Sequence, residues 1–264
     1  MLGSLLKIVV GVAIAVPLLM WLLQERMIFL PRPVEIRPAQ RANLEEVTIA
    51  VADGIKLRGW FIKGGSGREP LVIYFGGNAE EVSWLTDVAE RFAGWSLLLV
   101  NYRGYGESEG KPGERALLRD AVSVYDYARG RPDVDPERMV AMGRSLGSGV
   151  AVHLAAERKL RGVVLVSPYD SLVEVAKSHY PFVPVSLILR HRFDSLARAP
   201  QISTPLLCLV ASEDRIIQPS RSRALFDAWR GPKTWREVPG ADHNDISDAP
   251  GYWSSVADFL RSRR

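Results

Sequence analysis

The feature that most constrains this chain is a Gly-x-Ser-x-Gly motif at 143–147, which directly follows the apolar run at 139–142. Where a strand turns sharply into a helix, the residue at the turn is strained and side chains on either side of it would collide with neighbouring backbone. Gly143 and Gly147 avoid that collision because they carry no Cβ. The spacing therefore predicts that Ser145 is a nucleophile at a strand-to-helix turn; the alternative is a serine that caps a helix after a glycine turn.

Two loops are predicted to stabilise the oxyanion that would form when Ser145 attacks a carbonyl group. The turn itself points the N–H of Leu146 and the start of the helix at the serine oxygen. A second donor is expected from the loop after the apolar run 71–75, which reads Gly-Gly-Asn-Ala-Glu at 76–80. We predict that the N–H of Asn78 is this donor; a plain glycine turn is the alternative.

A serine hydroxyl needs a base, normally a histidine, and that histidine needs a carboxylate to orient it. Asp214 follows the apolar run 205–211, and His243 follows a strand predicted at 233–238. The carboxyl ends of parallel strands meet at one edge of a sheet, so both side chains are expected at the same edge as Ser145. The order Ser145, Asp214, His243 predicts a catalytic triad.

Other acids and histidines are weaker candidates for the triad. Glu213 is the nearest alternative acid, whereas Asp170 and Asp194 fall in a separate insert. The remaining histidines receive no catalytic role: His153, His179 and His191. The spacing of the histidines and acids matches no metal site, so neither a metal nor a cofactor is expected.

Charge and cysteine content argue against nucleic-acid binding and against an internal disulfide. The formal net charge is +4, and the arginines are spread along the chain rather than clustered among aromatic residues, which argues against nucleic-acid binding and suits an anionic membrane surface. Cys208 is the only cysteine, so an internal disulfide is excluded. Composition does not indicate an oligomeric state.

The first thirty residues are predicted to be a membrane anchor and its exit segment. Residues 2–23 are apolar apart from a few positions, and this length is sufficient to cross a bilayer as a helix. A cleaved signal peptide is the alternative, but no small-x-small cleavage site follows the apolar run. Arg26, Arg32, Arg37 and Arg41 favour a cytoplasmic domain without fixing the side of the membrane.

The remaining chain, 31–264, alternates short apolar strands with helices, which predicts one α/β domain with a mostly parallel sheet covered on both faces. Strands are expected at 45–51, 56–62, 71–75, 96–101, 138–142, 162–167, 205–211 and 233–238. Helices are expected at 80–92, 113–129, 146–158, 218–229 and 250–261. An apolar and aromatic insert at about 168–204 interrupts the alternation and is predicted to form a cap that favours an acyl chain, or else helices packed on the sheet edge.

These motifs resemble the alpha/beta-hydrolase superfamily, and within it the small membrane-anchored serine hydrolases. Besides the Ser145 motif, the resemblance rests on ERMIFLP at 25–31, FGGNA at 75–79, NYRGYGESEG at 101–110, SPYDSL at 167–172, YPFVP at 180–184, RFDSL at 192–196 and PGADHND at 239–245. The corresponding oxyanion loop in this branch commonly reads His-Gly-Asn-Ala-Gly, so Gly76 and Glu80 are departures from it.

The resemblance implies an eight-stranded, mostly parallel sheet and hydrolysis of esters or thioesters through Ser145, Asp214 and His243. It also implies that the loop at Gly77 and Asn78 is the oxyanion site. Monoacylglycerol lipases and protein depalmitoylases are among the relatives it suggests. Peptidase, acyltransferase or perhydrolase chemistry on the same triad remains open, as does a non-catalytic binding protein tethered to the membrane. The partners expected are a small-molecule or lipid acyl substrate and the bilayer.

Overall fold

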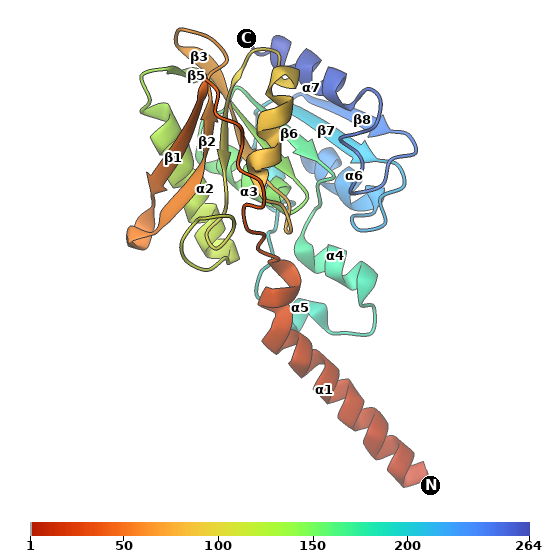
Figure 1. Ribbon diagram of the computed structural model, residues 1–264. Coiled ribbons are helices and arrows are strands. Elements are labelled where there is room, and N and C mark those ends of the chain that lie inside the picture. Colours follow the sequence, from red (N-terminus) through yellow and green to blue (C-terminus); the bar gives the residue numbers. More distant parts are fainter. Residues whose placement is uncertain (1) are drawn as a thin grey trace.

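The computed structural model describes residues 2–264 and contains one sheet that divides the body of the protein into two packed layers (Figure 1). The strands are β1 (Leu44–Ala50), β2 (Lys56–Ile62), β3 (Glu69–Phe75), β4 (Ser96–Val100), β5 (Val134–Arg144), β6 (Gly162–Val166), β7 (Leu206–Ala211) and β8 (Lys233–Val238). Their order is β1-β2-β4-β3-β5-β6-β7-β8, which confirms the predicted eight-stranded sheet.

Pairing in the sheet changes from antiparallel to parallel along its width. β1 pairs with β2, and β2 with β4, in antiparallel register, whereas all pairs from β4 through β8 are parallel. The hairpin between β1 and β2 turns at Asp53 and Gly54, which both have positive φ. Every residue of β4, β6 and β7 is buried, as expected for parallel strands covered on both faces.

Helices cover both faces of the sheet. One apolar layer holds α2 (Glu114–Arg129), α3 (Leu146–Glu157) and α6 (Pro219–Ala228); the other holds η2 (Val82–Phe92) and α7 (Tyr252–Arg261). The α-helix predicted at 80–92 is wrong in type, because this segment consists of 3₁₀ turns with a kink at Val88. Several β-branched residues lower its helix propensity, and packing against the sheet fixes its path instead.

The N-terminal helix α1 (Leu2–Ile28) extends away from the body (Figure 1). From Ser4 to Ile28 it is long enough and apolar enough to cross a membrane, and a signal sequence near an N-terminus has the same properties. Most of its side chains are exposed, but Gln24 is buried, and so is Phe29 just after the helix. The last turn of α1 therefore packs against the domain that follows it.

The predicted cap region contains α4 (Leu172–His179), α5 (Val185–Ile188) and the short turn η3 (Ala199–Gln201). It follows the carboxyl end of β6, and α5 contacts α1. Figure 1 shows α4 and α5 at the same end of the body from which α1 leaves. The cap therefore lies at the edge of the sheet where active sites of open α/β sheets are found.

A buried ion pair fixes the loop that follows β4. Arg103 forms two hydrogen bonds with Asp120 on α2, from Nε at 2.7 Å and from Nη2 at 2.6 Å. Both side chains are more than nine-tenths buried. Each charged group is stabilised by the other in place of water, since neither is accessible to bulk solvent.

Asp120→Ala should therefore lower the free energy of unfolding by about 3–5 kcal/mol, because it leaves the Arg103 charge buried and unpaired. Asp126→Ala is the matched control, since it removes an ion pair between the same helix and the more exposed Arg158 and should cost about 1 kcal/mol or less. Urea titration of the full-length protein in detergent, followed by tryptophan fluorescence, measures both. Equal losses of unfolding free energy in the two variants would contradict the stabilising role of the buried Arg103–Asp120 pair.

Candidate active site

Ser145 lies at the sharp turn from β5 into α3. Its backbone dihedrals, φ 51° and ψ −119°, are strained for a residue with a side chain. A Cβ at Gly147 would lie 2.0 Å from the carbonyl oxygen of Phe75, and one at Gly143 would lie 2.2 Å from that of Gly147. Glycine is thus required at both positions for α3 to begin this close to β3.

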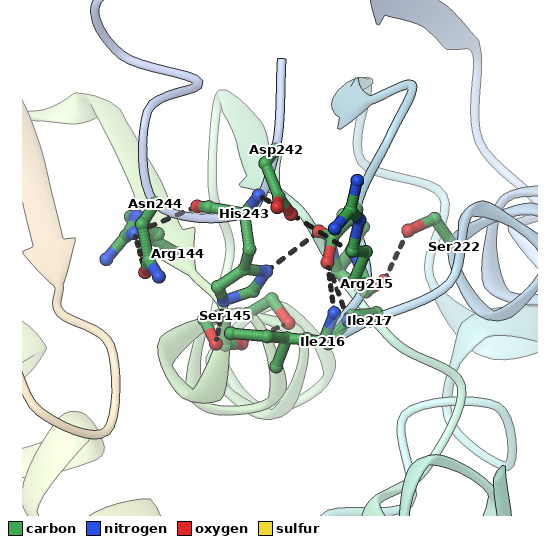
Figure 2. A network of polar contacts seen from close by, with 12 residues as sticks. Arg144, Ser145, Arg215, Ile216, Ile217, Ser222, Asp242, His243 and Asn244 are labelled. Atoms are coloured by element: carbon green, nitrogen blue, oxygen red, sulfur yellow. Dashed lines mark hydrogen bonds and ion pairs between the residues drawn. The ribbon is translucent and has the colours of Figure 1, made fainter. Parts of the chain in front are cut away.

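Ser145, His243 and Asp214 come from three separate loops and meet in a buried chain of hydrogen bonds. Figure 2 shows the side chains of Ser145 and His243 facing one another. His243 Nε2 lies 2.9 Å from Ser145 Oγ, and His243 Nδ1 lies 2.8 Å from Asp214 Oδ2. When the Nδ1–H group of His243 donates a hydrogen bond to Asp214, Nε2 is left as an acceptor for the serine hydroxyl. The structure therefore brings together the three residues that chain order predicts as a triad.

Backbone groups hold the Asp214 carboxylate in this orientation. Its second oxygen, Oδ1, accepts hydrogen bonds from the N–H groups of Ile216 at 3.0 Å and Ile217 at 2.7 Å. The neighbouring Glu213, which sequence left as an alternative acid, is exposed. Both oxygens of Asp214 are therefore used, one to fix the carboxylate and one to orient the histidine.

The other candidate acids and histidines take no part in this chain of hydrogen bonds, although His179 lines the cavity beside Ser145. Asp170 pairs with Arg221 at 2.9 Å, and Asp194 accepts the N–H of Ala197. His179 bonds to the carbonyl of Ile216, His191 packs edge-on against Phe29, and His153 lies on α3. Burial lowers the pKa of both His153 and His191, which favours their neutral forms.

The loop at 76–80 presents one free N–H group to the site. The hydroxyls of Tyr102 and Tyr105 donate to the carbonyl oxygens of Gly76 and Asn78, at 2.8 Å and 2.6 Å. Within residues 2–264, the N–H groups of Asn78 and Leu146 donate to no protein acceptor, and both residues line the cavity beside Ser145. Two free donors beside a serine hydroxyl are suited to an oxyanion.

Gly77 differs from Asn78 and Leu146, the other two residues of the predicted oxyanion site. Its N–H donates to the Glu80 carboxylate at 2.7 Å, so this group is already engaged. A Cβ at Gly77 would lie 3.2 Å from Arg144 Nη1 and 3.7 Å from Ser145 Cβ. Gly77 therefore allows the loop to lie close to the serine, and its donor role stays a prediction.

Comparison with known proteins agrees with the fold. Residues 67–181 match the family model for serine aminopeptidase S33. The uncharacterized protein Rv2307c of Mycobacterium tuberculosis is 37% identical over 90% of this chain and 86% of its own. WAV2 of Arabidopsis thaliana, an alpha/beta hydrolase domain-containing protein, is 27% identical over 95% of this chain and 91% of its own. The chain belongs to the alpha/beta-hydrolase superfamily.

Two further similarities concern the anchor and the fold. The uncharacterized membrane protein YNL320W of Saccharomyces cerevisiae is 30% identical over 82% of this alpha/beta hydrolase and 79% of its own length. The crystal structure of acetyl xylan esterase 1 from Thermoanaerobacterium sp. superposes with a TM-score of 0.69 at 21% identity, covering 85% of each chain. At that identity the likeness shows the fold alone.

Glu80, a departure from the usual oxyanion loop, organises the site of this alpha/beta hydrolase. Its buried carboxylate accepts hydrogen bonds from Tyr74 Oη at 2.8 Å, Trp84 Nε1 at 3.0 Å, the Gly77 N–H and Arg144 Nη1 at 3.1 Å. Burial and the adjacent carboxylate raise the pKa of Tyr74 well above its ordinary value, so its hydroxyl remains a donor. The hydrogen bonds of the Glu80 carboxylate thus hold the loop in a fixed position.

Arg144, directly before the serine, links three parts of the site. Besides Glu80, it bonds through Nη2 to the carbonyl oxygen of His243 at 3.0 Å and to Asn244 Oδ1 at 3.4 Å (Figure 2). Burial opposes the Arg144 charge, but the Glu80 carboxylate outweighs it and raises the pKa of the guanidinium. The ion pair between Glu80 and Arg144 was not predicted from the sequence. The pattern that could have indicated it is an arginine at the end of an apolar strand together with a glutamate shortly after two glycines.

A cavity of about 210 Å³ opens beside Ser145. Its walls come from α1, from the cap and from the loop after β7, and they are largely aliphatic. Representative lining residues are Met27, Leu172, Val175, Ile188 and Ile217. Such a lining can bind an alkyl or acyl group by removing apolar surface from water.

Glu80→Ala should lower the free energy of unfolding by about 3 kcal/mol or more, because it leaves four donors, including a buried guanidinium, without their acceptor. Glu90→Ala, at an exposed position of the η2 segment that follows this loop, is the control and should change it by about 0.5 kcal/mol or less. Chemical denaturation of both full-length variants in detergent measures the difference. A Glu80 variant as stable as the control would refute the organising role.

Proposed function

We propose that this protein is a membrane-tethered serine hydrolase that cleaves carboxylic ester or thioester bonds of acyl substrates through an acyl-enzyme. The observation that carries this proposal is the buried hydrogen-bonded series Ser145, His243 and Asp214 beside two free N–H donors and an apolar cavity. A serine, a base and an oriented carboxylate in this geometry form the machinery of acyl transfer.

In the first half of the reaction, His243 Nε2 removes the proton from Ser145 Oγ as this oxygen attacks the substrate carbonyl carbon. Negative charge moves to the carbonyl oxygen, where the N–H groups of Leu146 and Asn78 stabilise it. Asp214 stabilises the imidazolium that forms. His243 then donates its proton to the departing alcohol or thiol, and the acyl group stays on Ser145.

In the second half, His243 removes a proton from water and the resulting attack on the acyl-enzyme forms a second oxyanion. When this intermediate collapses, the carboxylic acid leaves and the proton returns to Ser145 Oγ. Acyltransferase or perhydrolase chemistry would differ only in the molecule that attacks here, an alcohol or peroxide in place of water.

The tether is α1, and two observations support it. The helix presents apolar, exposed side chains over a length that matches a bilayer, and the similar protein YNL320W carries the name of a membrane protein. Full-length protein should stay with membranes after carbonate washing. Release into the supernatant would favour a cleaved signal sequence or a peripheral protein.

A second candidate, aminopeptidase activity, is favoured by the description of the matching family model. An aminopeptidase must hold the charged α-ammonium group of its substrate, usually with a carboxylate. Among residues 2–264, those that line the cavity beside Ser145 include no Asp or Glu. The ester or thioester therefore remains the leading proposal, and amino-acid p-nitroanilides provide the comparison.

The direct test is a series of p-nitrophenyl esters and acyl thioesters from short to long chains, with amino-acid p-nitroanilides in parallel. Ser145→Ala and His243→Ala should each lower kcat by about 10⁴-fold or more, because the triad acts as a unit. His153→Ala is the control, since this histidine lies on α3 away from the triad, and it should retain activity. Near-normal turnover in the Ser145 or His243 variant would contradict the mechanism.

If well-folded protein shows no Ser145-dependent turnover on any of these substrates, either its specificity lies outside this series or the fold serves binding, and fluorophosphonate labelling of Ser145 decides between the two. Turnover confined to the p-nitroanilides would establish the aminopeptidase.

A further inference from the structure

The membrane-anchor helix forms one wall of the cavity beside Ser145. Met20, Gln24, Met27 and Ile28 line it, and their spacing places them on one face of α1. Opposite them stand side chains of the cap, among them Val175 and Ile188 on α4 and α5. The cavity therefore exists only where α1 and the cap lie together.

Polar contacts fasten α1 to the cap at this level. Gln24 Nε2 donates to the carbonyl of Ile188 at 3.2 Å, and its Oε1 accepts the N–H of Arg190 at 2.7 Å. Gln24 is buried, so these bonds are shielded from water. Just beyond the helix, the N–H of Leu30 donates to the carbonyl of Asn78, which ties the anchor to the oxyanion loop.

Position along α1 locates the cavity relative to a bilayer. From Leu2 to Trp21 the helix has about 20 residues, enough for the roughly 30 Å hydrocarbon core. The guanidinium of Arg190 lies 5.2 Å from the centre of the Trp21 ring, and Trp and Arg are residues of the membrane interface. Met20 is then at the interface, and Ile28 lies about 12 Å farther along the helix, beside the catalytic serine.

The outer edge of the cap is also apolar and exposed. Phe182, between α4 and α5, is 99% exposed, and Leu187 on α5 is 86% exposed. Large apolar side chains so exposed next to a membrane helix are suited to contact with lipid.

We propose, on the basis of the hydrolase function above, that α1 and the cap together form an acyl-chain channel whose mouth lies at the bilayer interface. Its occupant is the acyl chain of an ester lipid that resides in the membrane. The chain passes between α1 and α5 so that its ester group reaches Ser145 without crossing bulk water. The helix thus belongs to the substrate site and determines chain-length preference.

The first test uses full-length protein in phosphatidylcholine vesicles and compares kcat/KM for p-nitrophenyl palmitate and butyrate. Met27→Trp adds bulk inside the channel and should lower the palmitate-to-butyrate ratio of kcat/KM by about tenfold or more. Leu22→Trp is the matched control, because Leu22 lies on the other side of the same helix, is exposed and does not line the cavity; its ratio should equal that of wild type.

Met20→Trp serves as a second channel variant if the Met27 variant does not fold. Ratios unchanged in the channel variants, or changed equally in the control, would overturn the channel while leaving the hydrolase intact. Loss of all Ser145-dependent hydrolysis in wild type would instead count against the proposed function.

The second test does not need turnover. Ser145→Ala protein in vesicles is irradiated with a long-chain alkyl ether that bears a diazirine near its end, and labelled peptides are identified by mass spectrometry. Label on α4 or α5 that disappears in the Met27→Trp background is expected. Label only on α1, at the same level with and without Met27→Trp, would overturn the channel even if no ester were hydrolysed.

The third test locates the mouth. Phe182→Cys can be labelled selectively with an environment-sensitive fluorophore, because the single native cysteine, Cys208, is buried and burial raises the pKa of its thiol. In vesicles, emission from the label at position 182 should be shifted to the blue relative to emission from the same label at Lys159→Cys. Lys159 is an exposed position beyond the far end of α3. Identical aqueous emission at both positions would overturn the placement at the bilayer.

Discussion

The close approach of α3 to the end of β3 is the constraint on which the rest of the site depends. Helix α3 begins so near the Phe75 carbonyl that only glycine fits at position 147. This approach gives Ser145 its strained backbone and points the first N–H of the helix toward the loop after β3. Without it, the proposed nucleophile and the proposed oxyanion donors would face different parts of the molecule.

Around this contact, the site is held by groups that do not take part in the chemistry. Glu80 and Arg144 connect the oxyanion loop, the nucleophile strand and the histidine loop in one buried network. Tyr102 and Tyr105 fix the same oxyanion loop from its other side. Two independent sets of bonds thus orient one short loop, which is how a rigid site avoids reorganisation during reaction.

The sequence predicted the sheet, the strand-to-helix turn at Ser145 and the three residues that meet there. These features depend on local spacing and on the shared edge of a parallel sheet. It could not predict the role of Glu80, since its partners at Tyr74, Trp84 and Arg144 meet it only in the folded chain. The type of η2 was missed for a similar reason: packing overrode a helical pattern. Likewise, the sequence did not predict that α1 lines the cavity, because the face of α1 that does so is set by the position of α5 in the folded chain.

In the proposed mechanism Ser145 is a nucleophile activated by His243, and covalent labelling with a fluorophosphonate, located by mass spectrometry in full-length protein, tests this role directly. We expect a single adduct on Ser145 that is lost in Ser145→Ala and forms far more slowly in His243→Ala. An unlabelled Ser145 in folded protein, or equal labelling rates with and without His243, would contradict it.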